Sequence, residues 1–171
     1  MDSRKINKMN DRILVCYATR AGSTAEVAAA IGENLSQNGY SVDVKLIKDN
    51  PSLDGYQVAV IGSAIRMGNW LPEAVNYIKA NQQSLNHMPV ALFTVHMLNT
   101  GDDETSRTNR LAYLDKVRPL LEDPEEVYFE GKMDFSQLSF LDRMIAKMVN
   151  AVEADHRDWD RIGDWIPKKL E

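Results

Sequence analysis

Short apolar runs alternate along the chain with longer segments in which apolar residues recur every three or four positions. The runs at 57–63 (QVAVIGS) and 89–95 (PVALFTV) are almost continuously hydrophobic, as in strands covered on both faces. The predicted strands are Arg12–Tyr17, Ser41–Ile47, Gln57–Ser63, Pro89–Val95 and Glu126–Glu130. The predicted helices are Ala21–Gln37, Pro72–Gln83, a segment around Thr108–Leu121, Leu138–Val152 and Arg157–Lys169.

The alternation of strands and helices predicts an α/β fold. A strand, a helix and a second parallel strand form a right-handed unit, so the pattern implies a parallel sheet with helices on both faces. The chain has 171 residues, which suits a single domain. We expect a polar N-terminal tail over residues 1–10 and one domain over residues 11–171.

Composition narrows the classes of function. The formal net charge of −5 and the pI near 5.3 argue against binding to nucleic acid. The single cysteine, Cys16, excludes an intramolecular disulfide and favours a reducing compartment, so we expect a cytoplasmic protein. The longest apolar runs, near Val58–Ile65 and Pro89–Val95, are far shorter than the roughly 20 residues that a membrane-spanning helix needs. The histidines share no metal-ligand spacing, so we expect no metal site.

The loops after the first, third and fourth strands are the expected ligand site, because open parallel sheets bind ligands at the carboxyl ends of their strands. The first loop, Ala18–Thr24 (ATRAGST), runs directly into a helix. Free amide N–H groups and the helix dipole favour an anion there, which makes this loop a candidate phosphate cradle. The alternative is a serine or threonine that only caps an ordinary helix. Neither G-x-x-x-x-G-K-[ST] nor G-x-G-x-x-G is present, which favours a mononucleotide over ATP or NAD.

Two of these loops resemble those of a known family. Thr19–Thr24 (TRAGST) is similar to the FMN phosphate loop T/S-x-T-G-x-T of flavodoxins, with Ala21 where a threonine is common. Residues 60–70 (VIGSAIRMGNW) resemble the second loop of the flavodoxin branch that contains the menaquinone-dependent protoporphyrinogen dehydrogenases. Similar short motifs follow at 85–89 (LNHMP), 141–145 (LDRMI) and 158–159 (DW), so the resemblance extends over residues 12–166.

This resemblance implies a fold, a cofactor and a set of site residues. The fold is a flavodoxin-like three-layer sandwich with a five-stranded parallel sheet in the order 2-1-3-4-5, and the cofactor is FMN. The FMN phosphate would be held by Thr19, Arg20, Ala21, Gly22, Ser23 and Thr24. The isoalloxazine would be framed on one side by Ser63, Ala64, Ile65, Arg66, Gly68, Asn69 and Trp70, and on the other by Thr94, Val95, His96, Met97, Asn99 and Gly101.

The second loop has the chemistry that a flavin needs. Gly62 and Gly68 would let the backbone approach the ring edge closely. Ser63 and Asn69 carry polar groups for hydrogen bonds, and Trp70 would supply a stacking face.

Arg66 is the candidate catalytic residue of this loop. A cation beside the flavin would stabilise its reduced, anionic form or hold a substrate carboxylate. The alternative is a surface arginine paired with Glu73, an interaction normally worth about 0–1 kcal/mol.

The third loop, residues 94–101 (TVHMLNTG), lacks the aromatic residue that electron-carrier flavodoxins usually place there. We therefore expect a more open flavin face, as an enzyme that admits a substrate would need. His96 could donate a proton or hydrogen-bond the ring, and the alternative is an ordinary polar loop residue. Whether residues 102–116 form a helix or a mobile lid stays open.

The segment Leu138–Val152 carries a broad apolar stripe. Its members are Leu141, Met144, Ile145, Met148, Val149 and Val152. The stripe could face a membrane, a quinone or a partner protein, but we expect it to pack on the sheet as the last crossover helix.

Two functions remain. As an enzyme, the protein would oxidise protoporphyrinogen or a similar electron-rich substrate and pass electrons to a quinone. As a flavodoxin-type carrier, it would shuttle electrons between partner proteins and have no small-molecule substrate. Arg66 and the absent aromatic favour the enzyme, whereas the acidic composition favours the carrier.

Overall fold

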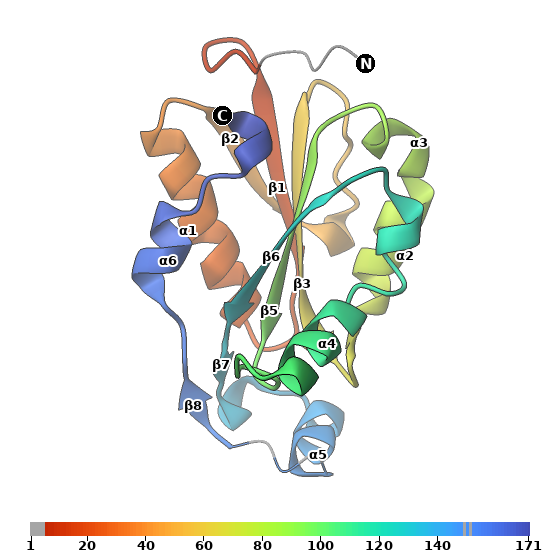
Figure 1. Cartoon of the computed structure of the whole chain (residues 1–171), viewed down its shortest axis with the longest axis vertical. Coiled ribbons are helices and arrows are strands. Elements are labelled where there is room, and N and C mark those ends of the chain that lie inside the picture. The colour runs from red at the N-terminus through yellow and green to blue at the C-terminus, as the bar shows by residue number, and fades with distance from the viewer. Residues whose placement is uncertain (1–5, 149, 151) are drawn as a thin grey trace.

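A parallel sheet forms the centre of the molecule (Figure 1). The computed structural model describes residues 6–148, 150 and 152–171. The parallel strands are β1 (Arg12–Ala18), β2 (Ser41–Leu46), β3 (Val58–Arg66), β5 (Val90–His96) and β6 (Glu125–Glu130). They lie in the order β2-β1-β3-β5-β6, with the short β4 (Asn69–Trp70) antiparallel to β3. Counted as parallel strands alone, the order is 2-1-3-4-5, so the predicted fold class is confirmed.

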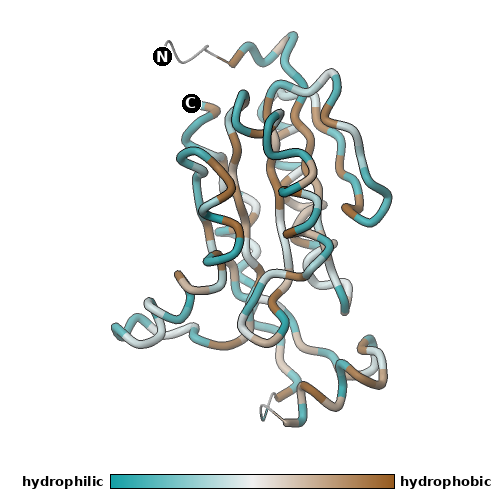
Figure 2. The backbone as a smooth tube through the Cα atoms, turned by 90° about the vertical axis from the view of Figure 1, so that its right-hand side faces the viewer, coloured by the Kyte–Doolittle hydropathy of each residue, from teal (hydrophilic) through white to brown (hydrophobic). Residues whose placement is uncertain are grey.

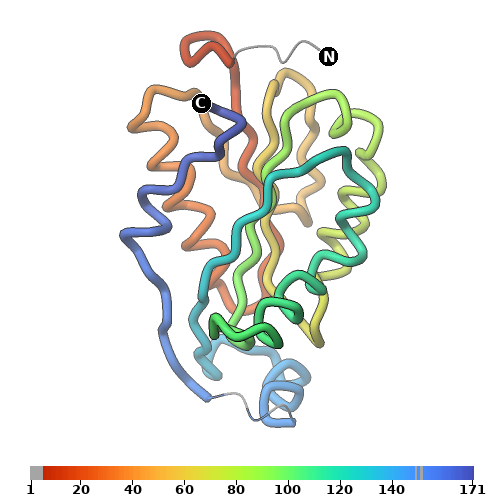
Figure 3. Tube along the Cα trace, viewed as in Figure 1, coloured from red at the N-terminus to blue at the C-terminus, as the bar shows by residue number. Residues whose placement is uncertain are grey.

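Helices cover both faces of the sheet. On one face lie α1 (Ser23–Gln37) and α6 (Trp159–Asp164), and on the other α2 (Pro72–Ala80), α3 (Gln82–Leu85) and α4 (Glu104–Ala112) (Figures 1 and 3). Because successive strand residues face opposite sides, Ile13 packs into the core under α1 while Leu14 packs into the core under α2. The strands are therefore buried on both faces, as their continuous hydrophobicity predicts.

The helix after β5 starts and ends earlier than predicted. It covers Glu104–Ala112 instead of 108–121, because Asp103 caps it by accepting hydrogen bonds from the N–H and hydroxyl of Ser106. Pro119 lies in a 3₁₀ turn at Arg118–Leu120, where an α-helix is disfavoured. The segment 102–116 thus contains a capped helix.

The predicted helix 138–152 does not pack on the sheet, and this expectation is wrong. After β6 the chain forms β7 (Lys132–Met133), a 3₁₀ turn at Phe135–Gln137 and α5 (Phe140–Met148), and then returns through β8 (Ala154–Asp155). The antiparallel pair β7–β8 carries α5 beyond the carboxyl ends of the strands, as Figures 1 and 2 show. The helix that packs on α1 is α6. Val149 of the predicted stripe lies outside the described residues.

Two further expectations concern the N-terminal tail and helices that could span a membrane. Residues 7–10 form a turn before β1, but residues 1–5 lie outside the described part, so the division into a tail and one domain stays a prediction. Within the described residues, no helix combines the length and the apolar character needed to cross a membrane.

Candidate functional site

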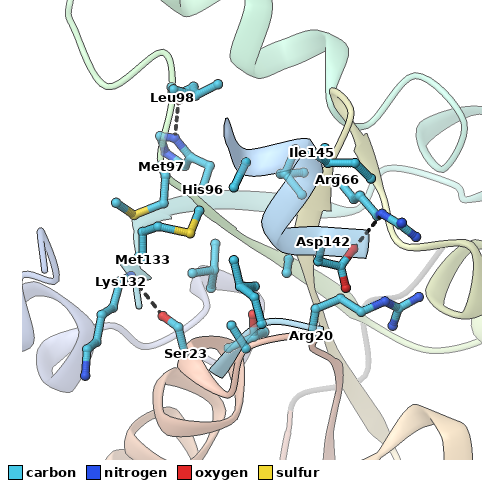
Figure 4. A pocket seen from close by; sticks show the side chains of 18 of the residues that line it. Arg20, Ser23, Arg66, His96, Met97, Leu98, Lys132, Met133, Asp142 and Ile145 are labelled. Atoms are coloured by element: carbon cyan, nitrogen blue, oxygen red, sulfur yellow. Dashed lines mark hydrogen bonds and ion pairs between the residues drawn. The ribbon is translucent and has the colours of Figure 1, made fainter. Parts of the chain in front are cut away.

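A cavity of about 520 Å³ opens at the carboxyl ends of the parallel strands (Figure 4). The three loops after β1, β3 and β5 border it, and the excursion from Gly131 to His156 closes its remaining side. Of the residues predicted for the site, the cavity is lined by Thr19, Arg20, Ala21, Ser23, Thr24, Ala64, Ile65, Arg66, Gly68, Val95, His96, Met97 and Asn99. Residues that are far apart in the sequence thus meet where parallel strands are expected to bind a ligand.

The loop after β1 presents the start of α1 to the cavity. Gly22 has a φ of 85°, a left-handed conformation that favours glycine, and its N–H donates a hydrogen bond to the Thr19 hydroxyl at 3.1 Å. No side chain of a described residue caps α1, so its first amide groups have no such partner. Gly22 itself borders a smaller adjoining hollow of about 60 Å³.

The donors of this loop suit a phosphate monoester. Thr19, Ser23 and Thr24 contribute hydroxyls, the uncapped helix contributes amides and the positive end of its dipole, and Arg20 contributes a cation. The Ser23 hydroxyl accepts a hydrogen bond from the N–H of Lys132 at 3.0 Å, which ties the loop to β7.

A tight hairpin after β3 forms the second wall. Met67 and Gly68 both have positive φ, at 51° and 76°, as the central residues of a type I′ turn do. This turn pairs Arg66 with Asn69 and Ile65 with Trp70. It therefore sets Ile65, Arg66, Met67 and Gly68 along the cavity.

Three predicted site residues lie in the core instead. The Ser63 hydroxyl donates to the carbonyl of Ala64 at 2.8 Å and accepts from the N–H of Leu71 at 3.0 Å. Trp70 is 2% exposed, and its indole N–H donates to the Thr94 hydroxyl at 2.8 Å. Trp70 therefore presents no stacking face to the cavity, because its ring is buried in the core on the α2 side of the sheet and its polar atom is already bonded.

Two more predicted residues support loops without lining the cavity. The Asn69 side chain donates to the carbonyl of Met67 at 3.0 Å, and the carbonyl of Gly101 accepts from Arg110 at 2.6 Å. Gly62, which we expected to let the backbone approach a flavin, is required by core packing: a Cβ there would lie 2.0 Å from the ring of Phe93.

Helix α4 fixes the third loop. Arg110 donates to the carbonyls of Asn99 and Gly101, and the Asn99 amide donates to the hydroxyl of Tyr113 at 2.6 Å. Tyr113 also lines the cavity, with its ring centroid 5.9 Å from that of His96. The third loop itself lacks an aromatic, but the end of the next helix supplies one. The side of the cavity next to His96 is therefore less open than the loop sequence predicts.

His96 is buried in the cavity wall. Its Nδ1 lies 2.8 Å from the carbonyl oxygen of Leu98, so in the neutral ring Nδ1 donates and Nε2 is left as an acceptor. Burial lowers the pKa of His96 below its ordinary value, which keeps the ring neutral at pH 7.

Arg66 has a different partner from the one considered in the sequence. Its Nε lies 2.9 Å from Oδ1 of Asp142 on α5 (Figure 4). Glu73 pairs instead with Arg20. Neighbouring Arg20 lowers the pKa of the Glu73 carboxyl. The Arg66 Nε is buried and donates no hydrogen bond to any residue that the structure describes.

One wall of the cavity is formed by residues that the sequence did not predict for the site. The additional lining residues are Met67, Leu98, Tyr113, Gly131, Lys132, Met133, Leu138, Asp142, Ile145, Ala146, Asn150, Val152, Ala154 and His156. Most of them belong to the excursion that carries α5. The apolar stripe of this segment was the available signal, but we assigned it to the sheet.

Comparison with known proteins identifies the family of this chain. A sequence model described as "Flavodoxin domain" matches residues 14–160. The chain belongs to the flavodoxin domain family. Within this family it is similar to the protoporphyrinogen IX dehydrogenase [quinone] of Escherichia coli strain K12, with 24% identity over 166 residues that cover 90% of this chain and 92% of that protein.

Solved flavodoxins share the fold. Oxidised flavodoxin 1 from Bacillus cereus aligns with a TM-score of 0.52 and 17% identity, over 84% of this chain and 100% of its own. A mutant flavodoxin of Fusobacterium nucleatum bound to flavin mononucleotide aligns with a TM-score of 0.53 and 14% identity, over 95% and 97%. Family membership and these relatives support a flavodoxin-type oxidoreductase with a flavin cofactor.

Proposed function

We propose that this flavodoxin-family protein binds FMN in the cavity and oxidises protoporphyrinogen, or a similar electron-rich substrate, with a quinone as acceptor, in the cytoplasm. The observation that carries the proposal is one continuous cavity that joins the uncapped start of α1 to a largely apolar chamber between the loops after β3 and β5. A phosphate with an aromatic ring attached has matching chemistry at both ends.

The phosphate would lie at Thr19, Ser23 and Thr24 and at the first amides of α1. Each charge-assisted hydrogen bond there would contribute about 1.5–3 kcal/mol. Arg20 adds a positive charge, already shared with Glu73. The ring would lie between the hairpin at Ile65–Gly68 and the loop that begins at His96, within reach of the groups that line the cavity.

Substrate oxidation needs a path for electrons and a hold on the substrate. Bound FMN would carry two electrons from substrate to quinone, with two protons lost by the substrate and two taken up as the quinone becomes a quinol. Arg66 is assigned the catalytic role of holding a substrate carboxylate or stabilising negative charge beside the ring. Neutral His96 would accept a hydrogen bond through Nε2.

The second candidate is an electron carrier that docks on partner proteins. The net charge of −5 favours it, as do the exposed apolar residues around the cavity mouth. Those residues include Met67, Leu98, Phe140 and Leu141. The same face could touch a membrane surface from which a quinone is drawn.

Anaerobic turnover separates the two functions. FMN-loaded protein is mixed with protoporphyrinogen and a menaquinone analogue, and porphyrin formation is followed by absorbance. If the protein is the enzyme, porphyrin should form only when the quinone is present. Arg66→Ala should slow this reaction at least about tenfold. Arg12→Ala, at the opposite end of the strands, should leave the rate unchanged. Flavin binding without turnover would favour the carrier.

A further inference from the structure

Two arginines stand at the mouth of the cavity, and each is neutralised by a carboxylate. Arg20 pairs with Glu73 of α2, and Arg66 pairs with Asp142 of α5. Figure 4 shows Asp142 between Arg66 and Arg20. The two ion pairs fix helices with different surroundings. Helix α2 is packed on the sheet, whereas α5 covers the cavity.

The Arg66–Asp142 pair is close but incomplete. Nε and Oδ1 are 2.9 Å apart, yet Nε is buried and forms no aligned hydrogen bond with a described residue. A buried donor without an acceptor costs free energy, which an oxygen placed in line with the N–H would recover. Asp142 therefore leaves this donor of Arg66 open to an oxygen with better alignment.

Few contacts besides this pair and the burial of Ala146 hold α5 against the rest of the described molecule. Phe140 and Met148 are more than three-quarters exposed, and Arg143 bonds the carbonyl of Phe135 within the same excursion. Among the described residues, the pair with Arg66 is the one ion pair that joins α5 to the sheet. Its loss should therefore loosen α5.

We infer that Asp142 stands in for a carboxylate of the substrate. Without such a ligand, the pair with Arg66 holds α5 closed over the cavity. A substrate carboxylate takes Arg66, Asp142 turns to water, and α5 loosens. The site thereby selects ligands that carry a carboxylate over neutral ones of the same shape. This selectivity rests on the proposed function, whereas the closure of α5 by the pair does not.

The closure is tested by hydrogen exchange of the α5 amides in protein without flavin or ligand. Asp142→Asn removes the charge but keeps an oxygen to accept from the Ser139 hydroxyl, so the start of α5 is preserved. Arg66→Gln breaks the pair from the other side without changing α5. Each variant should speed exchange about two- to fivefold, the range for a partly exposed pair, and the double variant no more than the faster single.

Glu73→Gln is the matched control, because it removes a carboxylate from the same cluster without touching α5. It should leave α5 exchange unchanged. Unaltered exchange in Arg66→Gln, or additive effects in the double variant, would overturn the closure whether or not the protein binds FMN.

The selectivity is tested with protoporphyrin IX and its dimethyl ester, which share a ring and differ in charge. Asp142→Asn should tighten binding of the free acid about two- to fivefold and leave the affinity for the ester unchanged. Since coupling is reciprocal, the acid should also speed α5 exchange in the natural protein, and the ester should not. Equal changes in affinity and in α5 exchange for both porphyrins, or no change for either, would refute the selectivity. The turnover assay tests the proposed function separately.

Discussion

Gly62 has no room for a side chain, although it lies in the middle of β3. It faces Phe93 of β5 across the parallel pair, and a Cβ there would lie 2.0 Å from the ring Cζ and 2.2 and 2.3 Å from its Cε atoms. Carbon atoms normally approach to about 3.5 Å, so the fully buried ring would have to retreat by about 1.5 Å. We predict that Gly62→Ala lowers the free energy of unfolding by about 3 kcal/mol, the upper part of the range for an overpacked core.

Urea denaturation followed by circular dichroism measures this loss. The matched control is Gly163→Ala in α6, where nothing lies within 4 Å of the added Cβ and alanine is the better helix former. It should be neutral or stabilising. Adding Phe93→Leu to Gly62→Ala should recover part of the loss by making space. If Gly62→Ala costs no more than Gly163→Ala, the register between β3 and β5 is wrong.

Three further predictions concern the site and its supports. Trp70→Phe should cost about 1 kcal/mol of stability in the same assay, because it leaves the Thr94 hydroxyl without its indole donor, and no loss would contradict the core placement. Burial lowers the pKa of His96, so the unfolded chain takes up the proton first and the free energy of unfolding should fall as pH drops below about 6.5. His96→Gln should flatten this fall between about pH 6.5 and 5. An unchanged pH profile in this variant would count against the burial of a neutral His96. Gly22→Ala and Gly39→Ala both place alanine at positive φ and should each lower the free energy of unfolding by about 1–2 kcal/mol. Only Gly22→Ala should weaken FMN binding in a fluorescence titration. Equal weakening by both variants would refute the role of the loop after β1 in binding phosphate.

Local periodicity predicted most of the fold. The buried strands show it best, because a strand covered on both faces needs a continuous apolar run such as 89–95. The strand order came from the family resemblance, since periodicity does not determine which strands are neighbours. The bounds of the predicted helix at 108–121 were missed, because the cap at Asp103 starts the helix earlier and the turn that contains Pro119 prevents it from reaching residue 121.

The site was predictable only where one loop carries it. The loop after β1 holds its donors within six residues, so its motif was readable. The placement of α5 was not, because an apolar stripe has the same spacing whether it covers a sheet or a cavity. The Arg66–Asp142 pair and the burial of Trp70 join residues distant in the sequence, and no local pattern encodes them.

Titration of the purified protein with FMN and with riboflavin tests whether the loop after β1 binds the phosphate of FMN. Flavin fluorescence reports binding of both, and they differ only in the phosphate. We expect micromolar or tighter binding of FMN and at least about tenfold weaker binding of riboflavin, since one charge-assisted hydrogen bond is worth that factor. No binding of FMN, or equal affinity for the two flavins, would contradict the assignment of the loop after β1 as a phosphate site.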